Sequence, residues 1–359
     1  MCDLYNMNEI NSVTEINLPK QSLERLRDLV VTSSRIVILP HTAPDGDALG
    51  STLALRSVLQ SLHPDKNICV ISPDLVEQYL GWMPEVDKLL HYTTSSDEAI
   101  AAIAEADLLI HMDHNQRSRL RYQPLVEAVT KSSAQSILID HHLYPEAGFA
   151  VCFSYPGISS TCELVLRLVQ ALGWQEYISP ASATLLLTGI VTDTGRFMYG
   201  CFAPDLYHRV SDLLSLGADY GYIIDRLSYH GRIEQLRAQG YVLHEKLEVY
   251  PELRAACFVL TQEEMQRLGV SKGDTEGLVN LPLSVEGIDC SCFIREDRGQ
   301  IKLSFRSTGD FPVNEIASRG FSGGGHLNAS GAEHYGSIEE AKNIYLYQLK
   351  CLIEERKKS

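Results

Sequence analysis

Four short segments of the chain contain carboxylates, and some of them also contain imidazoles. These side chains bind divalent cations in sites that lack thiolate ligands. Their candidate donors are His41, Asp45 and Asp47; Asp113; Asp140, His141 and His142; and Asp193. Any one of these carboxylates has an ordinary explanation, because Asp often caps a helix or closes a surface turn. That explanation becomes weak when four such segments occur in one chain.

The donor types indicate which cations would bind. Carboxylates and imidazoles without thiolate suit Mn²⁺, with Mg²⁺, Co²⁺ or Fe²⁺ as alternatives, rather than structural zinc. Several carboxylates in one pocket would repel each other unless cations neutralised them. Two cations roughly 3.5–4 Å apart that share a carboxylate can activate water and stabilise in-line displacement at phosphorus. The donor set therefore predicts hydrolysis of a phosphate ester.

The strands and helices expected around these segments predict that the four segments lie close together in the fold. Short apolar runs at 35–39, 107–112 and 136–139 read as buried strands that precede the first three segments, and a fourth such run lies at 67–71. Helical patterns at 48–62 and 96–105 alternate with them, which favours a parallel sheet covered on both faces. Asp193 closes the apolar run 185–191. Ligands bind beyond the carboxyl ends of such strands, so we expect one site at that edge.

The rest of the chain predicts a second, smaller domain. Residues 159–248 are mainly helical, strands are expected at 254–260, 288–295 and 300–305, and helices at 262–268 and 338–355. The prediction is an α/β protein in which two domains flank a cleft. The larger domain, 1–225, would have the parallel sheet and the metals. A helical linker, 226–248, would join it to a substrate-binding domain at 249–359.

A glycine-rich run, Gly323-Gly324-Gly325-His326, lies in this second domain. Successive glycines let the backbone approach a ligand closely and turn its N–H groups toward an anion; a flexible loop is the alternative reading. Arg306 ends the strand-like run KLSFRS, and arginine can bind a phosphate through two parallel hydrogen bonds. The two features together predict a phosphate or nucleotide clamp. Phe197, close to Asp193, could stack a base or simply pack in the core.

At this point the motifs resemble a known family. The segments HTAPDGDALGS, HMDHN, IDHH and TDTG resemble the four motifs of the DHH phosphoesterase superfamily. The GGGH run resembles the motif of the DHH-associated C-terminal domain. Five motifs in the right order cover roughly residues 35–331. By its length, the chain is most similar to the stand-alone nanoRNase and phosphoadenosine-phosphate phosphatase (oligoribonuclease) subgroup.

The resemblance implies a role for each matching residue. One metal would be held by His41, Asp45 and Asp113, and the other by Asp47, Asp113, His141 and Asp193, so that Asp113 bridges. Asp140 would orient an adjacent imidazole, and His142 would face the substrate phosphate or leaving group. The substrate contacts would be Arg306, Gly324, Gly325 and His326. His114 has no implied role, and we expect a solvated loop histidine there.

The implied activity is Mn²⁺-dependent hydrolysis of short oligonucleotides or dinucleotides, of the 3′–5′ exonuclease type. 3′-Phosphoadenosine 5′-phosphate and cyclic dinucleotides are further candidate substrates. The alternatives are a RecJ-like exonuclease on long single strands, an inorganic pyrophosphatase or polyphosphatase, and a non-catalytic nucleotide-binding protein.

Charge and composition narrow the partners. The 359-residue chain has a net charge of −15, whereas proteins that bind long nucleic acid normally present a basic track. We therefore expect a short oligonucleotide or nucleotide as substrate and no long nucleic acid. A homodimer is an open alternative to a monomer. No apolar run is long enough to span a bilayer, no secretory signal is evident, and we expect a cytoplasmic protein. The nine cysteines contain no CxxC pair, which favours reduced core thiols.

Overall fold

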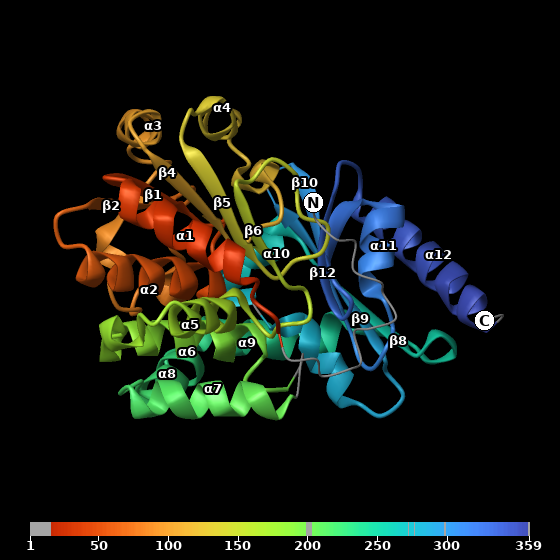
Figure 1. Cartoon of the computed structure of the whole chain (residues 1–359). Helices are drawn as coiled ribbons and strands as arrows, with labels where there is room; N and C mark the ends of the chain where they lie inside the picture. The colour runs from red at the N-terminus through yellow and green to blue at the C-terminus, as the bar shows by residue number, and fades with distance from the viewer. Residues whose placement is uncertain (1–15, 199–202, 272, 276, 298, 358–359) are drawn as a thin grey trace. The chain divides into compact units, whose positions relative to one another are not determined.

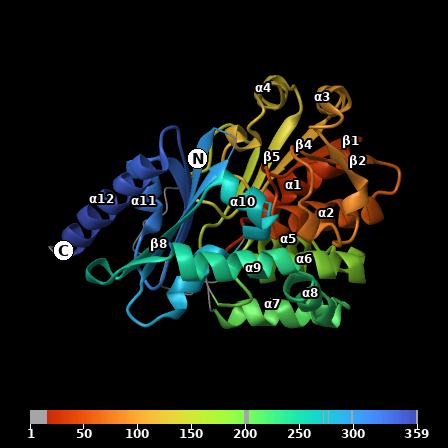
Figure 2. The same cartoon turned by 180° about the vertical axis from the view of Figure 1, so that it is seen from behind.

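The computed structural model describes residues 16–198, 203–271, 273–275, 277–297 and 299–357. The chain divides into two compact units between Tyr229 and His230. In Figure 1 the first unit runs from red to green and the second from green to blue, and Figure 2 gives the reverse view. Each unit has its own sheet, so each is described separately.

The sheet of the first unit has six strands, all parallel, in the order β3-β2-β1-β4-β5-β6. Their bounds are β1 Arg35–Leu39, β2 Asn67–Ser72, β3 Leu89–His91, β4 Leu108–Met112, β5 Gln135–Asp140 and β6 Val151–Ser154. The parallel sheet and its four central strands are confirmed. The two edge strands β3 and β6 were not predicted, because each is short and only partly buried.

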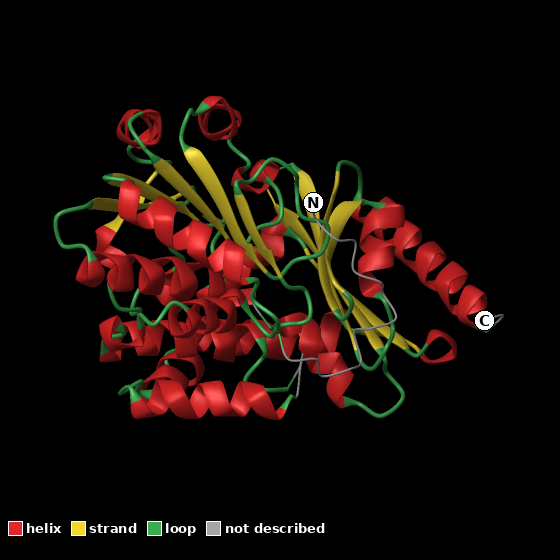
Figure 3. Ribbon diagram, viewed as in Figure 1, coloured by secondary structure: helices red, strands yellow, loops and turns green. Residues whose placement is uncertain are grey.

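Helices cover both faces of this sheet, as predicted (Figure 3). The helices of the unit are α1 Lys20–Thr32, α2 Gly46–Leu62, α3 Ser96–Ala104, α4 Gln123–Lys131, α5 Thr161–Ala171, α6 Pro180–Asp193, α7 Pro204–Ser215 and α8 Tyr220–Ser228. Alternate residues of β1 show the two layers. Ile36 and Ile38 pack with the core of α1, α2, α5 and α6, whereas Val37 and Leu39 pack with α3 and α4.

The sheet of the second unit is mixed, in the order β11-β12-β10-β9-β8-β7, and only β8 and β9 pair in parallel. Its strands are β7 Glu248–Tyr250, β8 Ala255–Leu260, β9 Cys290–Asp297, β10 Gln300–Ser307, β11 Ser322–His326 and β12 Ala329–His334. Its helices are α9 Ile233–Tyr241, α10 Gln262–Leu268, α11 Val313–Gly320 and α12 Ile338–Arg356. The three predicted strands and both predicted helices are confirmed. None of the helices in the described ranges is long and apolar enough to cross a membrane.

The glycine-rich run belongs to this sheet. It forms the edge strand β11, which pairs antiparallel with β12 through a tight turn at Leu327 and Asn328. The flexible-loop reading of the run is therefore wrong. Sequence patterns missed β11 because glycine is rare in strands, and here the strand forms because its partner β12 pairs with it along its whole length.

The cysteines that the structure describes are free thiols. Four of them are buried, at Cys162, Cys257, Cys290 and Cys292, and burial raises the pKa of the Cys290 thiol to about 12. The prediction of reduced core thiols holds for these four. Cys2 and Cys201 lie outside the described residues.

Candidate metal centre

The candidate donors of the first unit lie where strands end and where helices begin or end. Asp113 directly follows β4, His141 directly follows β5, and His41 lies two residues after β1. Asp193 is the last residue of α6. Because β1, β4 and β5 are parallel neighbours (Figure 1), their carboxyl ends deliver these side chains to one edge of the sheet.

Asp45 both caps a helix and presents a donor atom. Its Oδ1 accepts hydrogen bonds from the backbone N–H groups of Asp47 and Ala48, each at 3.0 Å, so it is the N-cap of α2. Its Oδ2 lies 3.9 Å from Nε2 of His41. Asp45 can therefore cap α2 through Oδ1 and still offer Oδ2 to a metal ion.

The predicted ligands fall into two groups that could each hold one ion. In each group, one donor atom per residue lies within 4.8 Å of the others. The groups are His41, Asp45 and Asp113, and Asp47, His141 and Asp193. In the second group, Nε2 of His141 lies 3.8 Å from Oδ2 of Asp47 and 3.5 Å from Oδ2 of Asp193.

Asp113 belongs to the first group but also lies next to the second. Its Oδ2 is 3.5 Å from Nε2 of His41, and its Oδ1 is 3.5 Å from Nε2 of His141. Each oxygen therefore faces a different group, as a bridging carboxylate must. The backbone of Asp113 is left-handed, with φ of 58°, a conformation that costs a non-glycine residue roughly 1–2 kcal/mol. The side chain lies next to both groups while the backbone is in this disfavoured conformation, so contacts elsewhere must offset its cost.

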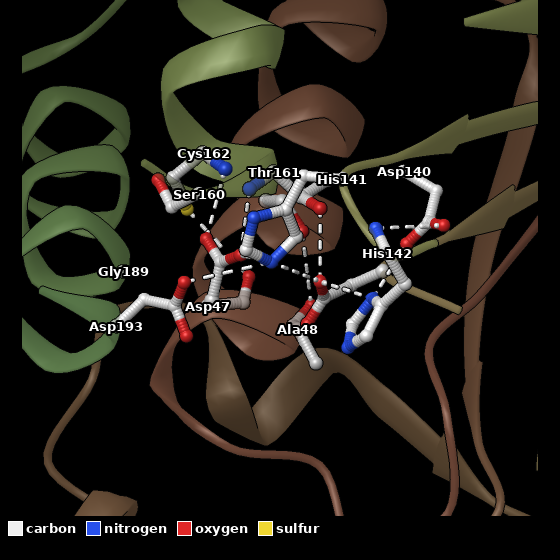
Figure 4. Close-up of polar contacts among 12 residues, drawn as sticks. Asp47, Ala48, Asp140, His141, His142, Ser160, Thr161, Cys162, Gly189 and Asp193 are labelled. Carbon is white, nitrogen blue, oxygen red and sulfur yellow. Dashed lines mark hydrogen bonds and ion pairs between the residues drawn. The ribbon is translucent and has the colours of Figure 1, made fainter. Parts of the chain in front are cut away.

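The N-terminus of α5 orients the buried carboxylate of Asp47 (Figure 4). The backbone N–H of Thr161 donates to Oδ2 at 2.7 Å, and that of Cys162 donates to Oδ1 at 2.8 Å. Both oxygens thus accept one hydrogen bond from the positive end of a helix. Gly189 makes room for this arrangement, because a Cβ there would lie 2.8 Å from Oδ1 of Asp47.

Asp140 and His142 form a pair beside the donors. Oδ2 of Asp140 accepts the backbone N–H of His142 at 3.0 Å, and Oδ1 lies 2.8 Å from Nδ1 of the same residue. A carboxylate only accepts, so Nδ1 of His142 bears a proton. That Asp140 orients an adjacent imidazole for function remains a prediction. In the geometry, that imidazole is His142.

Burial and crowding shift the pKa values of the donors. Burial alone would lower the pKa of His141, but the carboxylates of Asp193, Asp113 and Asp47 raise it to about 10. Burial, together with repulsion from Asp113 and Asp193, raises the pKa of Asp47 well above its usual value. Burial also raises the pKa of Asp193 to about 6, although His141 opposes that change. The cluster therefore holds more negative charge than its own imidazoles can neutralise.

This donor set fits a pair of divalent cations. Asp47 and Asp113 are each 1% exposed and His141 is 2% exposed, so water cannot solvate these side chains and bound cations would have to neutralise the excess negative charge. Each group offers imidazole and carboxylate and no thiolate donor, which suits Mn²⁺, Mg²⁺ or Co²⁺. The Sγ of the buried Cys162 makes weak contacts with two backbone carbonyl oxygens, that of Asp47 at 3.6 Å and that of Leu185 at 4.0 Å.

The structure corrects the expectation for His114. It is not a solvated loop histidine, because its side chain is completely buried. His111, in β4, is also completely buried, and its Nδ1 lies 3.0 Å from Nε2 of His114. Burial and the charge of Arg117 lower the pKa of His111 to about 3. The sequence did not predict the burial of His111 and His114, because a polar residue next to a loop motif is normally expected to be exposed.

Two other residues near the donors were also missed. Thr161 donates its hydroxyl hydrogen to Oδ1 of Asp113 at 2.8 Å. Asp74, after β2, accepts hydrogen bonds from the hydroxyl groups of Thr42 and Tyr122 and, at 2.7 Å, from the backbone N–H of Ala43. The capping pattern Ser160-x-x-Glu163 could have marked the start of α5, but nothing local marks Asp74.

The substrate-contact candidates of the second unit occupy one row of its sheet. Ala329 in β12 pairs with Arg306 in β10 on one side and with His326 in β11 on the other. Directly paired residues point to the same face, so Arg306 and His326 share a face. It is the face opposite the core, since the alternate residues Leu303 and Phe305 are the buried ones. Gly324 and Gly325 lie on the exposed part of β11.

Phe197 has a packing role in the structure. Its ring packs against the core of the first unit and lies 5.8 Å from the ring of Tyr207. Its backbone is left-handed, with φ of 63°. Phe197 is only partly buried, which agrees with the interpretation of a core or rim aromatic; base stacking stays a prediction.

Comparisons with known proteins agree with these motifs. The DHH family, N-terminal domain, matches residues 35–190, and the DHHA1 domain matches residues 255–349. A probable bifunctional oligoribonuclease and PAP phosphatase, NrnA, of Streptococcus mutans is 30% identical over 323 residues, which are 89% of this chain and 95% of that protein. The cyclic-di-AMP phosphodiesterase PdeA of Listeria monocytogenes is 28% identical over 317 residues, 85% of this chain and 45% of that protein.

A solved structure resembles both units. The exopolyphosphatase-related protein from Bacteroides fragilis is 39% identical, with a TM-score of 0.87, and the match covers 94% of this chain and 98% of that one. The fold, the order of the motifs and the similarity to these relatives over most of this chain agree. The chain therefore belongs to the DHH family of phosphoesterases, with a DHH domain followed by a DHHA1 domain.

Proposed function

We propose that the chain is a two-metal phosphoesterase that hydrolyses short oligonucleotides and dinucleotides. The observation that carries this proposal is the placement of Asp113, whose two carboxylate oxygens face two different donor groups. Such a shared carboxylate holds two cations a few ångströms apart, the spacing that phosphoryl transfer uses. No comparable arrangement is needed for binding a nucleotide alone.

In this proposal the residues predicted from the sequence are the metal ligands. One ion is held by His41, Asp45 and Asp113, and the other by Asp47, Asp113, His141 and Asp193. The two geometric groups support this division. Mn²⁺ is the proposed ion because the donors mix imidazole with carboxylate, and Mg²⁺ and Co²⁺ suit the same donors. When bound, the ions would activate water and neutralise charge on the phosphoryl group.

His142 is the proposed proton donor to the leaving oxygen. Its Nδ1 donates to Asp140, and we propose that its other ring nitrogen, Nε2, gives a proton to the substrate. A carboxylate on Nδ1 fixes the tautomer and the orientation of the ring. Asp140 is therefore a positioning residue that acts through His142.

Arg306 and the edge strand β11 are the proposed substrate contacts. The edge strand presents backbone N–H and C=O groups that no further strand pairs within the described residues. Gly324 has no heavy atom within 4 Å of the position that a Cβ would take, so a ligand could approach the backbone there. Arg306, Gly324, Gly325 and His326 would together bind the phosphates of one or two nucleotides.

The substrate class rests on the relatives and on charge. The S. mutans relative is named for oligoribonuclease and PAP phosphatase activity, and the L. monocytogenes relative for hydrolysis of cyclic di-AMP. The net charge of −15 disfavours many backbone contacts with a long strand. We therefore propose short linear oligonucleotides, degraded from the 3′ end, as the main substrates, with PAP and cyclic dinucleotides as secondary ones.

The test is a turnover panel in Mn²⁺ with a dinucleotide, a 20-nucleotide RNA, cyclic di-AMP, PAP and pyrophosphate as substrates. The highest kcat/KM is expected for the dinucleotide. Fastest turnover of pyrophosphate would favour a pyrophosphatase, and processive degradation of the long RNA with a steep salt dependence would favour a RecJ-like enzyme. Nucleotide binding without turnover in any divalent cation would favour a non-catalytic protein. Oligonucleotides labelled at either end identify the polarity.

A further inference from the structure

His111 and His114 form a buried pair that the proposed mechanism does not use. His111 Nδ1 lies 3.0 Å from His114 Nε2, and His114 Nδ1 lies 2.9 Å from the carbonyl oxygen of Met112. The two rings meet edge to face, with centroids 5.2 Å apart. Nε2 of His111 is buried and has no hydrogen-bond partner among the residues that the structure describes. A buried imidazole costs free energy unless its nitrogens are hydrogen-bonded, so the pair calls for an explanation beyond packing.

The carbonyl oxygen of Met112 determines which ring nitrogens of His111 and His114 bear hydrogen. A carbonyl oxygen only accepts, so Nδ1 of His114 bears hydrogen and donates to Met112. In the neutral ring Nε2 of His114 is then the acceptor, and Nδ1 of His111 must donate to it. The hydrogen bonds therefore run in one direction, from His111 through His114 to the Met112 carbonyl.

That carbonyl immediately precedes Asp113. The hydrogen bond from the ring of residue 114 to the carbonyl of residue 112 closes a loop around the backbone of Asp113, whose φ of 58° is disfavoured for a residue with a Cβ. The backbone N–H of Asp113 donates to Ile139 at 3.1 Å, and Thr161 holds its Oδ1. The backbone and the side chain of Asp113 are thus both restrained. The hydrogen bond from His114 to Met112 joins the two residues on either side of it.

We propose that His114, oriented by His111, is a positioning residue that holds Asp113 in its left-handed conformation and so maintains the shared carboxylate between the two donor groups. The inference rests on the proposed metal site but not on the identity of the substrate. Without the His114 donor, the backbone of Asp113 can relax toward the extended region. Its carboxylate then moves away from at least one group, and both metal affinity and turnover fall.

Two substitutions at one position separate positioning from packing. Asparagine in His114→Asn places its Nδ2 where His114 has Nδ1, so it keeps the donor to Met112 but loses ring volume. Phenylalanine in His114→Phe keeps the ring but has no donor. If the histidine only packs, H114F should be the milder change; if it positions Asp113, H114N should be. His244→Asn is the matched control, because His244 is on the surface with a side chain 87% exposed.

The measurements are Mn²⁺ titration calorimetry, Tm without metal, and kcat and KM on a dinucleotide. H114F is expected to weaken Mn²⁺ binding by about 10- to 100-fold, as loss of a residue that orients a ligand usually does, and to lower kcat more than it raises KM. H114N should bind Mn²⁺ close to wild type even if its Tm falls further. Equal Mn²⁺ affinity in H114F and wild type, or weaker binding in H114N than in H114F, would overturn the proposal.

Calorimetry keeps this inference distinct from the proposed function. A wild-type protein that binds Mn²⁺ but does not cleave the dinucleotide would contradict the proposed substrate while leaving the comparison of H114N with H114F intact. A wild-type protein that binds no divalent cation would remove the metal site and, with it, the role of His114.

Discussion

The candidate metal cluster and the glycine-rich strand β11 differ in burial and in charge, and each therefore offers a different way to bind a ligand. The cluster gathers charged donors, and Asp47, Asp113 and His141 are nearly inaccessible to water. Strand β11 has few side chains, and residues 322–325 are exposed. A buried charge must be held in place by hydrogen bonds, or its desolvation is not compensated. An exposed backbone donor needs only space in front of it, and glycine provides that space.

The comparison predicts different responses to substitution. Changes in the cluster should alter metal content and abolish turnover, because its donors act as a set. Changes at β11 and Arg306 should be graded and should act on KM, because each contact adds to binding independently. The following predictions, from the largest expected effect to the smallest, test that division.

Asp113→Asn should have the largest effect. The amide keeps the shape of the side chain and can still accept from Thr161, but it removes the charge shared by both donor groups. We expect turnover to fall by at least about a thousandfold and both Mn²⁺ affinities to fall, since the two groups share this residue. Metal analysis and single-turnover kinetics check it; loss of only one ion would show that Asp113 does not bridge.

His142→Ala should lower kcat by about a hundredfold or more, the usual contribution of a general acid, while both ions stay bound. His244→Ala provides the control at an exposed position. A substrate with a better leaving group should recover part of the lost rate, because it needs less protonation. Loss of an ion in His142→Ala would make His142 a ligand instead.

Metal affinity should rise with pH near neutrality. The pKa of His141 is raised to about 10 by the surrounding carboxylates, so its ring is protonated at pH 7 in the metal-free protein. A metal binds the neutral ring, so binding must release that proton and affinity should increase by about tenfold per pH unit below pH 10. Calorimetry in buffers with different ionisation enthalpies counts the protons. No proton release at pH 7 would contradict the raised pKa.

Arg306→Ala should raise KM for a dinucleotide by about tenfold, the effect of losing one charge-assisted hydrogen bond, without changing metal content. Lys302→Ala is the matched control, because Lys302 lies on the same face of β10 and pairs with Glu333. Equal effects of the two substitutions would indicate general charge attraction rather than a specific contact.

Gly323→Ala and Gly324→Ala should differ although the residues are neighbours. A Cβ at Gly323 would overlap Ala332 and the Gly331 carbonyl, whereas one at Gly324 meets no atom within 4 Å. Gly323→Ala should therefore lower the free energy of unfolding by about 1–3 kcal/mol. Gly324→Ala should change it by less than about 0.5 kcal/mol and should instead raise KM. Urea unfolding and steady-state kinetics on both variants distinguish these outcomes; an unchanged KM would separate Gly324 from the substrate.

Much of the first unit could be predicted from local patterns. The strands at 35–39, 67–71, 107–112 and 136–139 are short, apolar and buried, and they occur where predicted. Parallel order then places the residues that follow them at one edge. Strands β3, β6, β7, β11 and β12 were missed because they are short or lack a clear apolar pattern, and pairing with neighbouring strands decides them.

The sequence alone determined the donor types, their order and the edge at which they gather, because strand-forming runs and the residues after them are local properties. Only the tertiary structure decided that each oxygen of Asp113 faces a different group, that His114 is buried, and that Thr161 and Asp74 reach the site. These features depend on hydrogen bonds between residues far apart in the chain. Such bonds form only once the helices have packed on the sheet and have buried Asp47, Asp113 and His141.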